Sequence, residues 1–515
     1  MDTSAHVPSH EPSGPGGRHH CPERDRPFVL TVAILASALG FIDGSVVAIA
    51  IPQIRASLDA TFAEIQWVAN AYVLCLAAFM LLGGAAGDRY GMKRTFGAGI
   101  ALFIVASMAC AFAWSPVSLI VARAVQGLGA AIMVPCSLAL IAKNYPREDR
   151  GRAIGLWAAA SSLTTALGPV LGGWLLTTGG GEAWRWVFAI NLPLGGLALW
   201  LLWRRVPEDA GRSTEPLDAL GAVLATLALG ALAFGLTLLG EGAGETVSVW
   251  PWMLLAASVA LGLVWIVHLR RSTHPMIDLT LFGSSGFSGA NASTFLLYTA
   301  LGGVLFFLPM TIVTAWGLSE LEAGSIFLPF SLLIAGLSPW AGRWADRAGS
   351  RLPLTVGPAI VGVGFAMAAL SVPGHAFWSG LLPALLVVGI GMGITVSPLS
   401  TAVMLAVDDD HSGEASGVNN MVARMANLFA IAGLGAIAAL IHDAHVASSS
   451  LPGRFRDALV DAGYGERLTG ALYLPEVAAV QGTAMDSAFA WLCWLTAALA
   501  FLAALVGWRT QGARS

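Results

Sequence analysis

The sequence predicts an all-α membrane protein with fourteen transmembrane helices, built as two pseudo-symmetric six-helix bundles with two inserted helices between them. Three observations support this fold class. The 515 residues are 56% hydrophobic and only 11% charged, whereas soluble domains carry about 25% charged residues. Fourteen apolar windows are long enough to cross a bilayer. A short charged motif in the first half of the chain recurs in the second, which indicates two homologous bundles.

The apolar windows are separated by charged or Gly/Pro-rich breaks, which mark the ends of the expected helices. We expect these helices near residues 28–51, 66–86, 95–114, 118–142, 152–177, 184–203, 217–240, 249–269, 286–313, 322–342, 352–371, 378–406, 414–440 and 485–508.

The windows divide the chain into a first half, an insert and a second half. The first six helices occupy residues 28–205, the two inserted helices 206–285, and the last six helices 286–508. Residues 1–27 are polar and rich in Pro, Gly and His, so they cannot bury a core and should form a disordered tail. Residues 509–515 form a second, short tail.

Charged residues set the expected orientation. Most of the 27 Lys and Arg residues fall in the tails and in loops on one side of the membrane. The positive-inside rule then places both termini in the cytoplasm and the longest loop, 443–484, outside. Arginine is far commoner than lysine, which indicates a bacterial genome and hence the bacterial plasma membrane. The net charge of −4 disfavours nucleic-acid binding, and we expect a monomer in the lipid bilayer.

The sequence shows no metal or catalytic cluster. None of the five cysteines forms a pair with metal-ligand spacing, and no histidine lies in the middle of a predicted span. No combination of His, Asp and Ser suggests catalysis within the bilayer. We therefore expect neither an enzyme nor a bound cofactor.

One charge stands out in the first expected span, which reads FVLTVAILASALGFIDGSVVAIAI. A carboxylate such as Asp43 costs at least ~2.5 kcal/mol within a span on insertion scales, so it should face a partner, a water-filled cavity or a proton. Arg123, in the fourth span, lies at a similar depth. Either Asp43 carries a coupling proton that Arg123 tunes, or the two residues form a permanent ion pair between helices.

The recurring motif reads GAAGDRYGMKR at 84–94 and GRWADRAGSR at 342–351. Both copies follow a predicted span and fall in a tight cytoplasmic turn. The matching positions are Gly84, Asp88, Arg89, Gly91 and Lys93 in the first copy, and Gly342, Asp346, Arg347, Gly349 and Arg351 in the second. Parallel repeats of this kind are typical of transporters whose substrate site lies between the two halves.

The first copy of this motif resembles the signature loop of the major facilitator superfamily. LIVARAVQGLGAA at 119–131 is similar to that superfamily's fourth-helix motif, and TTALGPVLGGWL at 164–175 to the fifth-helix motif of its antiporters. Together with the fourteen spans, these motifs resemble the 14-helix drug:proton antiporters. Thr164 departs from the fifth-helix pattern, which usually opens with Gly.

The resemblance assigns further roles. It implies a gating role for the two charged loops, although their charges can also act only as a topology signal. Gly168, Gly172 and Gly173, with Pro169, have a small-residue spacing that ordinary packing of membrane helices also explains. The resemblance implies that their helix lies at the interface between the halves.

A polar stripe and two further residues are candidates for the substrate cavity. Gln126 can contact substrate or orient Arg123, because the two lie three residues apart on one helical face. Arg424, Asn420 and Asn427 can contact substrate or form a buried network, and Tyr298 can line a cavity or pack.

These expectations converge on a proton-coupled antiporter that exports lipophilic small molecules such as drugs, antiseptics and antibiotics by alternating access. Protons and a small-molecule substrate are then its partners, with the proton as coupling ion. The alternatives are an exporter dedicated to one endogenous metabolite or antibiotic, and a membrane sensor that transports nothing. Because no second deep carboxylate would balance a dication, neutral, zwitterionic or monocationic substrates are expected.

Overall fold

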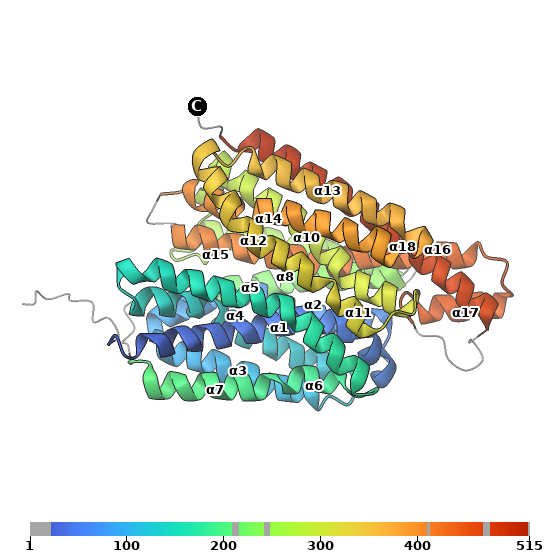
Figure 1. The fold of residues 1–515 in the computed structure, drawn as a ribbon, viewed down its shortest axis with the longest axis horizontal. Coiled ribbons are helices and arrows are strands. Elements are labelled where there is room, and N and C mark those ends of the chain that lie inside the picture. Colours follow the sequence, from blue (N-terminus) through green and yellow to red (C-terminus); the bar gives the residue numbers. More distant parts are fainter. Residues whose placement is uncertain (1–21, 209–215, 242–247, 409–411, 467–473, 513–515) are drawn as a thin grey trace, which may run out of the picture.

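The computed structural model describes residues 22–208, 216–241, 248–408, 412–466 and 474–512. Within them the chain is helical, and fourteen helices are long and apolar enough to cross a membrane, which confirms the predicted number. The helices lie roughly parallel to one long axis (Figure 1). Most of the tail expected to be disordered, residues 1–21, lies outside the described residues, as do 513–515.

Six spans make up the first half. They are α1 (Arg26–Leu58), α2 (Phe62–Tyr90), α3 (Met92–Ala111), α4 (Pro116–Asn144), α5 (Arg147–Thr178), and a sixth span formed by α6 (Trp184–Ala189) and α7 (Asn191–Arg205). Local sequence sets their ends. Thr61 and Glu64 form a reciprocal capping box that starts α2. Gly91 ends α2 with a φ of 94°, a conformation that glycine adopts without strain.

Glycines let α4 approach its neighbours closely. A Cβ at Gly83 would overlap the backbone of Ala131, and a Cβ at Gly129 would overlap the backbone of Phe103. Helix α4 packs closely on both α2 and α3. Lipid offers no hydrophobic drive for helix association, so close packing of small residues supplies much of the attraction.

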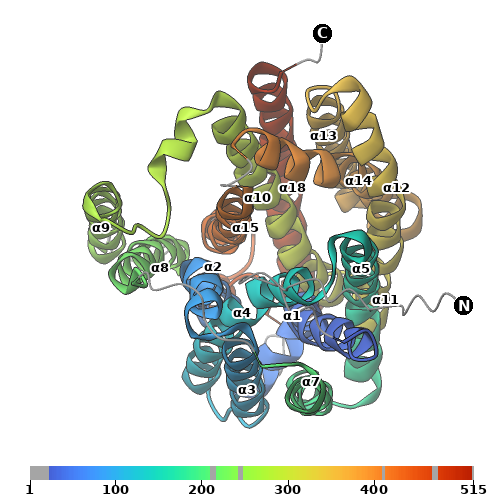
Figure 2. The same cartoon turned by 90° about the vertical axis from the view of Figure 1, so that its left-hand side faces the viewer.

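The inserted helices are α8 (Ala219–Glu241) and α9 (Trp250–Arg271). Viewed end-on, they lie at the side of the molecule next to α2 (Figure 2). Helix α8 contacts α2, whereas α9 packs chiefly on α8. Asp218, which precedes α8, connects the two inserted helices. Its carboxylate accepts hydrogen bonds from the side chain of His268 in α9 and from the backbone amide of Met276.

The second half follows a short 3₁₀ segment. It comprises α10 (Ser285–Thr314), α11 (Glu320–Ser325), α12 (Phe327–Ala348), α13 (Pro353–Ser371), α14 (Leu382–Leu405), α15 (Ser412–Phe429), α16 (Gly435–Ala447), α17 (Gly453–Ala462) and α18 (Pro475–Thr510). Helices α15 and α16 form one span through a π-helical segment, and α11 and α12 form another.

The described part of the expected loop 443–484 is largely helical. Helix α16 continues to Ala447, α17 forms a separate helix, and α18 begins at Pro475, ten residues before the expected start of the last span. The early turns of α18 carry Glu476, Gln481 and Asp486. A hydropathy window ends at such residues, although a helix can continue through them into the membrane surface.

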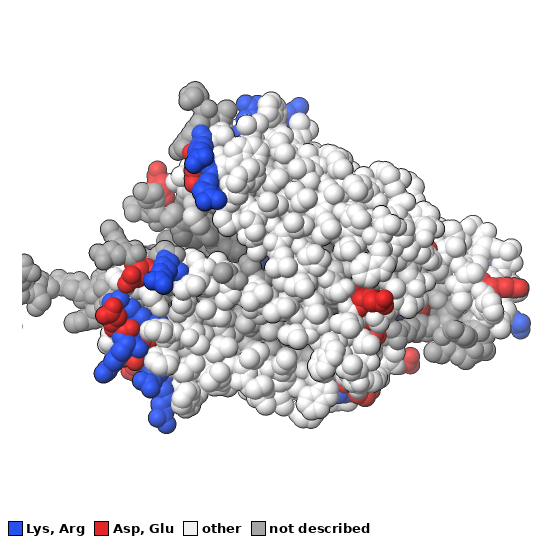
Figure 3. All heavy atoms as spheres, in the orientation of Figure 1, with Lys and Arg blue, Asp and Glu red and all other residues white. Residues whose placement is uncertain are grey.

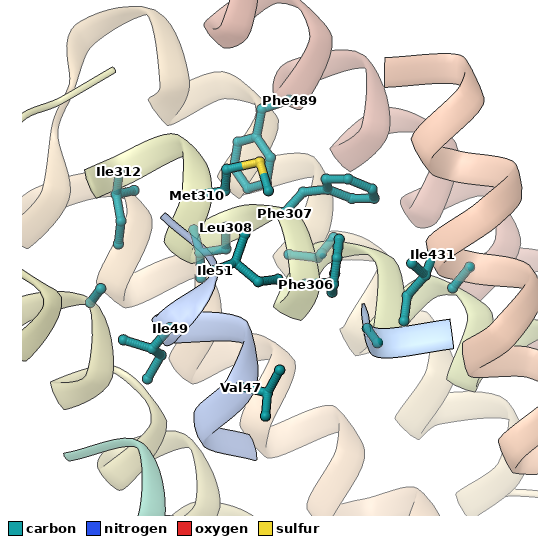
Figure 4. Packing of buried hydrophobic residues seen from close by; sticks show 14 of the residues in the cluster. Val47, Ile49, Ile51, Phe306, Phe307, Leu308, Met310, Ile312, Ile431 and Phe489 are labelled. Carbon is teal, nitrogen blue, oxygen red and sulfur yellow. The ribbon is translucent and has the colours of Figure 1, made fainter. Parts of the chain in front are cut away.

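An apolar cluster joins the two halves towards the α11 and α17 end of the molecule. Ile49 and Ile51 of α1 pack with Phe306 and Phe307 of α10, and Phe489 of α18 covers them (Figure 4). At the opposite end Lys and Arg gather, and the flank between the ends is almost free of charge (Figure 3). This arrangement is the one expected of a protein embedded in a bilayer.

Candidate functional site

The centre of the first half contains a buried ion pair. Nη1 of Arg123 on α4 lies 2.5 Å from Oδ2 of Asp43 on α1. The two side chains are 2% and 0% exposed. Nε of Arg123 also donates to the backbone oxygen of Val68 on α2, at 3.1 Å. The structure thus brings together the two residues that the sequence placed at similar depth.

Gln126 completes this pair rather than facing an open cavity. Its Nε2 donates to Oδ1 of Asp43 at 2.9 Å, and its Oε1 accepts from Nη1 of Arg123 at 2.6 Å. The side chain is fully buried. Of the two roles that the sequence left open for Gln126, this geometry fits the one that orients Arg123.

The network extends to residues that the sequence analysis did not single out. Ser107 of α3 accepts from Gln126 and from Asn191 of α7, and donates to the Phe188 carbonyl. The guanidinium of Arg123 lies over the ring of Tyr72 of α2, 4.2 Å from its centroid. In the sequence, Ser107, Asn191 and Tyr72 are only polar or aromatic residues within an apolar window. Such residues are common, so they do not mark a site.

In chemical terms the network surrounds a carboxyl group with hydrogen-bond donors and a positive charge. Both oxygens of Asp43 accept hydrogen bonds, and Arg123 supplies the opposite charge. Buried pairs of this kind are sensitive to the loss of either charge, since the remaining charge is left without compensation. Protonation of Asp43 would therefore change the balance of forces between α1 and α4.

The polar residues of α15 form a second candidate site. Asn420 is exposed and donates to the Ser416 carbonyl of its own helix. Arg424 is half-buried, and no described residue pairs with it. Asn427 lies against Gly302 of α10. Asn419, which the predicted site did not include, donates to Asn291 and Thr294, so that part of the stripe is structural.

Tyr298 of α10 is half-buried, and Arg424 lies within electrostatic range of it. Tyr72 is in electrostatic range of Asp43, Arg123 and Arg424. Helix α15 contacts α2, which carries Tyr72, so the polar stripe and the ion pair of the first half lie on neighbouring helices.

The two charged loops share a backbone conformation. Gly91 and Gly349 both have positive φ, 94° and 81°, and each ends a long helix. Within these loops Asp88, Asp346 and Arg347 are exposed, whereas Gly84 packs near Pro135. The repeat in the sequence thus corresponds to a repeat in local geometry.

Basic residues of the first loop lie against aromatic rings. Arg89 lies over the ring of Tyr90. Lys93 is buried, donates to the Trp203 carbonyl at 3.3 Å and lies over its ring. Lys93 therefore joins the loop to α7 of its own half.

The glycines of α5 lie where the halves meet. A Cβ at Gly168 or Gly172 would collide with Ser45 or Val46 of α1. A Cβ at Gly173 would overlap the backbone of Glu320 in α11. The carbonyl of Pro169 in turn lies against Gly324 of the same helix. Helix α5 therefore packs against its own half on one side and against the second half on the other.

A polar contact joins the halves at the same end of the molecule. Arg55 of α1 is 4% exposed and lies 2.6 Å from the carboxylate of Glu466, which follows α17. Its guanidinium also donates to the carbonyls of Ala462 and Tyr464. We call this set of contacts between Arg55 and residues 462–466 the Arg55 latch.

Comparison with known proteins identifies the family. Residues 33–433 match the model of the Major Facilitator Superfamily. The chain is 33% identical to the multidrug resistance protein Stp of Mycobacterium tuberculosis over 414 residues. This alignment covers 79% of this chain and 76% of Stp. It is 34% identical to the cephamycin export protein CmcT of Amycolatopsis lactamdurans, over 78% and 83% of the two chains.

A further relative is the methylenomycin A resistance protein of Bacillus subtilis, which is 32% identical over 79% of this chain and 87% of that protein. Among solved structures, the chain resembles a bacterial homologue of the human lysosomal transporter Spinster in an inward-facing, unoccupied conformation. The TM-score is 0.69 at 17% identity, with 96% and 100% of the two chains covered. It also resembles a D-xylose–proton symporter, with a TM-score of 0.61 at 15% identity over 94% and 97% of the chains.

The structural likenesses support the fold alone, while the family match and the sequence relatives cover most of the chain. This multi-pass membrane protein therefore belongs to the Major Facilitator Superfamily and is a transporter rather than an enzyme.

Proposed function

We propose that this protein is a proton-coupled antiporter that exports lipophilic small molecules from the cytoplasm across the bacterial plasma membrane. The observation that carries the proposal is the Asp43 site, where a carboxylate within a span is paired with Arg123 and Gln126. The relatives named for multidrug resistance and drug efflux support the direction of transport and the breadth of substrates. The protein acts as a monomer with both termini in the cytoplasm.

In this mechanism Asp43 takes up a proton from outside and releases it inside. When ionised, it binds Arg123 and holds α1 against α4. When protonated, it loses its attraction for the guanidinium, which keeps its contacts to the Val68 carbonyl and the Tyr72 ring. The two protonation states thus favour different arrangements of the first half, and a proton can shift the population between them.

Alternating access requires contacts that break and re-form between the halves. The α5–α11 contact at Gly173 and the Arg55 latch lie at one end of the molecule, where the apolar cluster also joins the halves. We infer that these contacts close the outer side. The charged loops at the other end have a gating role on the cytoplasmic side.

The test is the Asp43→Asn variant in proteoliposomes. With an imposed pH gradient, the wild type should accumulate one or more of a cationic dye, a neutral antibiotic and an organic acid. The variant should lose this accumulation but retain exchange of labelled for unlabelled substrate, which needs no net proton movement. Full gradient-driven activity of the variant would contradict the proposal. Glu208→Gln, at an exposed carboxylate, is the matched control.

A dedicated exporter of one antibiotic is a second candidate. Relatives named for cephamycin export and methylenomycin A resistance favour it. A screen separates the two, because a dedicated exporter transports one scaffold and its close analogues, whereas a multidrug exporter transports unrelated ones. A wild type that moves no compound in such a screen would instead favour the sensor hypothesis.

A further inference from the structure

Arg424 stands where the two halves meet. Helix α15 packs between α2 of the first half and α10 of the second (Figure 2). Gly417 lies against Leu81 of α2, and Leu428 clusters with Leu74 of α2. Arg424 is seven residues after Gly417 and four before Leu428, so it shares their helical face. The interactions of its charge with Tyr72 and Tyr298 agree with this position.

In the described part of the chain, the charge of Arg424 has no counter-ion. It is half-buried, and among the described residues no carboxylate or hydrogen-bond acceptor pairs with it. By contrast, Arg55 and Arg123, the arginines that are buried in the described part of the chain, each have a carboxylate partner. An arginine within a span is costly and faces a partner or a water-filled cavity. Since the described residues supply no such partner, the guanidinium is free to bind a group that enters from a cavity between the halves.

The surroundings of Arg424 suit an oxyanion. A guanidinium presents several N–H donors in a planar fork that matches a carboxylate. Tyr72 and Tyr298 lie on α2 and α10, the two helices that α15 contacts, and Asn427 lies one turn after Arg424 along α15. Asp43 does not neutralise Arg424, because both of its oxygens are bound to Arg123 and Gln126.

We propose that Arg424 is the substrate's counter-ion, so that the exported molecules include lipophilic compounds with a carboxylate or a similar acidic group. This inference rests on the proposed export function and narrows its substrate class. It extends the expectation from the sequence, which considered only the absence of a second deep acid and therefore favoured neutral, zwitterionic or monocationic substrates. A zwitterion is consistent both with the absence of a second deep acid and with the proposed role of Arg424, since its acidic group can bind Arg424.

A matched series of three fluorescent ligands tests the proposal. Dansylglycine is an anion, dansylglycinamide is its neutral analogue, and dansylcadaverine is a cation. Their binding to the purified protein in nanodiscs is measured by fluorescence anisotropy, with empty nanodiscs as the baseline. Arg424→Gln should weaken dansylglycine about tenfold relative to the wild type, as expected for a charged hydrogen bond. Binding of the amide and the cation should change by less than about twofold, because neither offers an anion.

Two further variants serve as a conservative substitution and as a control. Arg424→Lys keeps the charge but loses the planar fork, so dansylglycine binding should fall by an intermediate factor. Arg271→Gln removes a positive charge from the peripheral helix α9 and should leave all three affinities unchanged. Gel filtration and the melting temperature without ligand show whether each variant folds as the wild type does.

The inference is overturned if Arg424→Gln leaves the ratio of acid to amide affinity unchanged, whether both affinities stay the same or fall together. The export function is tested separately by gradient-driven transport of the same ligands. A wild type that binds dansylglycine through Arg424 but transports none of the three compounds would contradict the proposed function. It would leave the anion site in place.

Discussion

At the scale of single residues, the Asp43 site is a set of mutually dependent contacts. Arg123 binds Asp43, Gln126 and the Val68 carbonyl, and Gln126 binds both charged residues. Loss of one partner leaves the others with unmet hydrogen bonds in a medium that has no water to replace them. Stability and the proposed proton coupling therefore depend on the same side chains.

A double-mutant cycle measures this dependence. Arg123→Gln should lower the free energy of unfolding by about 3–5 kcal/mol, because it leaves the Asp43 charge buried and unpaired. Asp43→Asn should also destabilise the protein, and the double variant should lose less than the sum of the two single losses. Denaturation in detergent gives the three values. Additive losses would show that the two residues do not act as a pair in solution.

The sequence could predict the pair but not the network around it. Asp43 and Arg123 were recognisable because a charge within an apolar window is costly and needs an explanation. Tyr72, Ser107 and Asn191 were not, since moderately polar residues occur in many spans and their contacts depend on how the helices are rotated. The position of Arg424 on the face of α15 towards α2, and the absence of a partner for it among the described residues, are also visible only in three dimensions.

At the scale of helices, the α5 glycines set the distance between the halves. Gly173 lies directly against the backbone of Glu320, which cannot move aside as a flexible side chain can. A Cβ at Gly155, on the same helix, would meet no atom within 4 Å. The two positions therefore form a matched pair for substitution.

Gly173→Ala should push α11 away from α5 and weaken outer closure, which would lower the transport rate severalfold. Gly155→Ala should leave the rate unchanged or slightly stabilise the helix, by up to about 1 kcal/mol. Counterflow transport in proteoliposomes gives both rates. Equal rates for the two variants would mean that close α5–α11 packing is not required for transport.

The Arg55 latch gives a second test at this scale. Arg55→Gln removes the ion pair with Glu466 and weakens the hold on residues 462–466. Spin labels placed on the outer ends of α1 and α17 should then report a longer or broader distance distribution by pulsed electron spin resonance. A distribution identical to that of the wild type would contradict the role of the latch in closure.

The latch should also respond to pH. Burial raises the pKa of Glu466 when the latch is closed, and Arg55 only partly opposes this effect. An acid with a raised pKa stabilises the closed form at low pH, and this contribution is lost as the pH rises through the raised value. The open population should therefore grow as the pH increases above the usual range of a glutamic acid. In Glu466→Gln the same distance measurement should lose this dependence on pH.

At the scale of the whole molecule, the sequence was sufficient for the fold class. Apolar windows gave the number of spans because every backbone polar group in lipid must be satisfied within a helix. They did not give the ends of α1 or α18, where helices extend beyond the apolar region into more polar sequence. They also did not show that α17 contacts α1, since contacts between distant segments leave no trace in local hydropathy.

The proposed function of the whole molecule requires that export of substrate is coupled to entry of a proton through Asp43. Its most direct measurement uses proteoliposomes that contain a pH-sensitive dye and the purified protein, without an initial pH gradient. Addition of substrate to one side should drive protons in the opposite direction, and Asp43→Asn should abolish this proton flux while retaining substrate exchange. A wild type that moves substrate with no proton flux, or with protons in the same direction, would contradict the account.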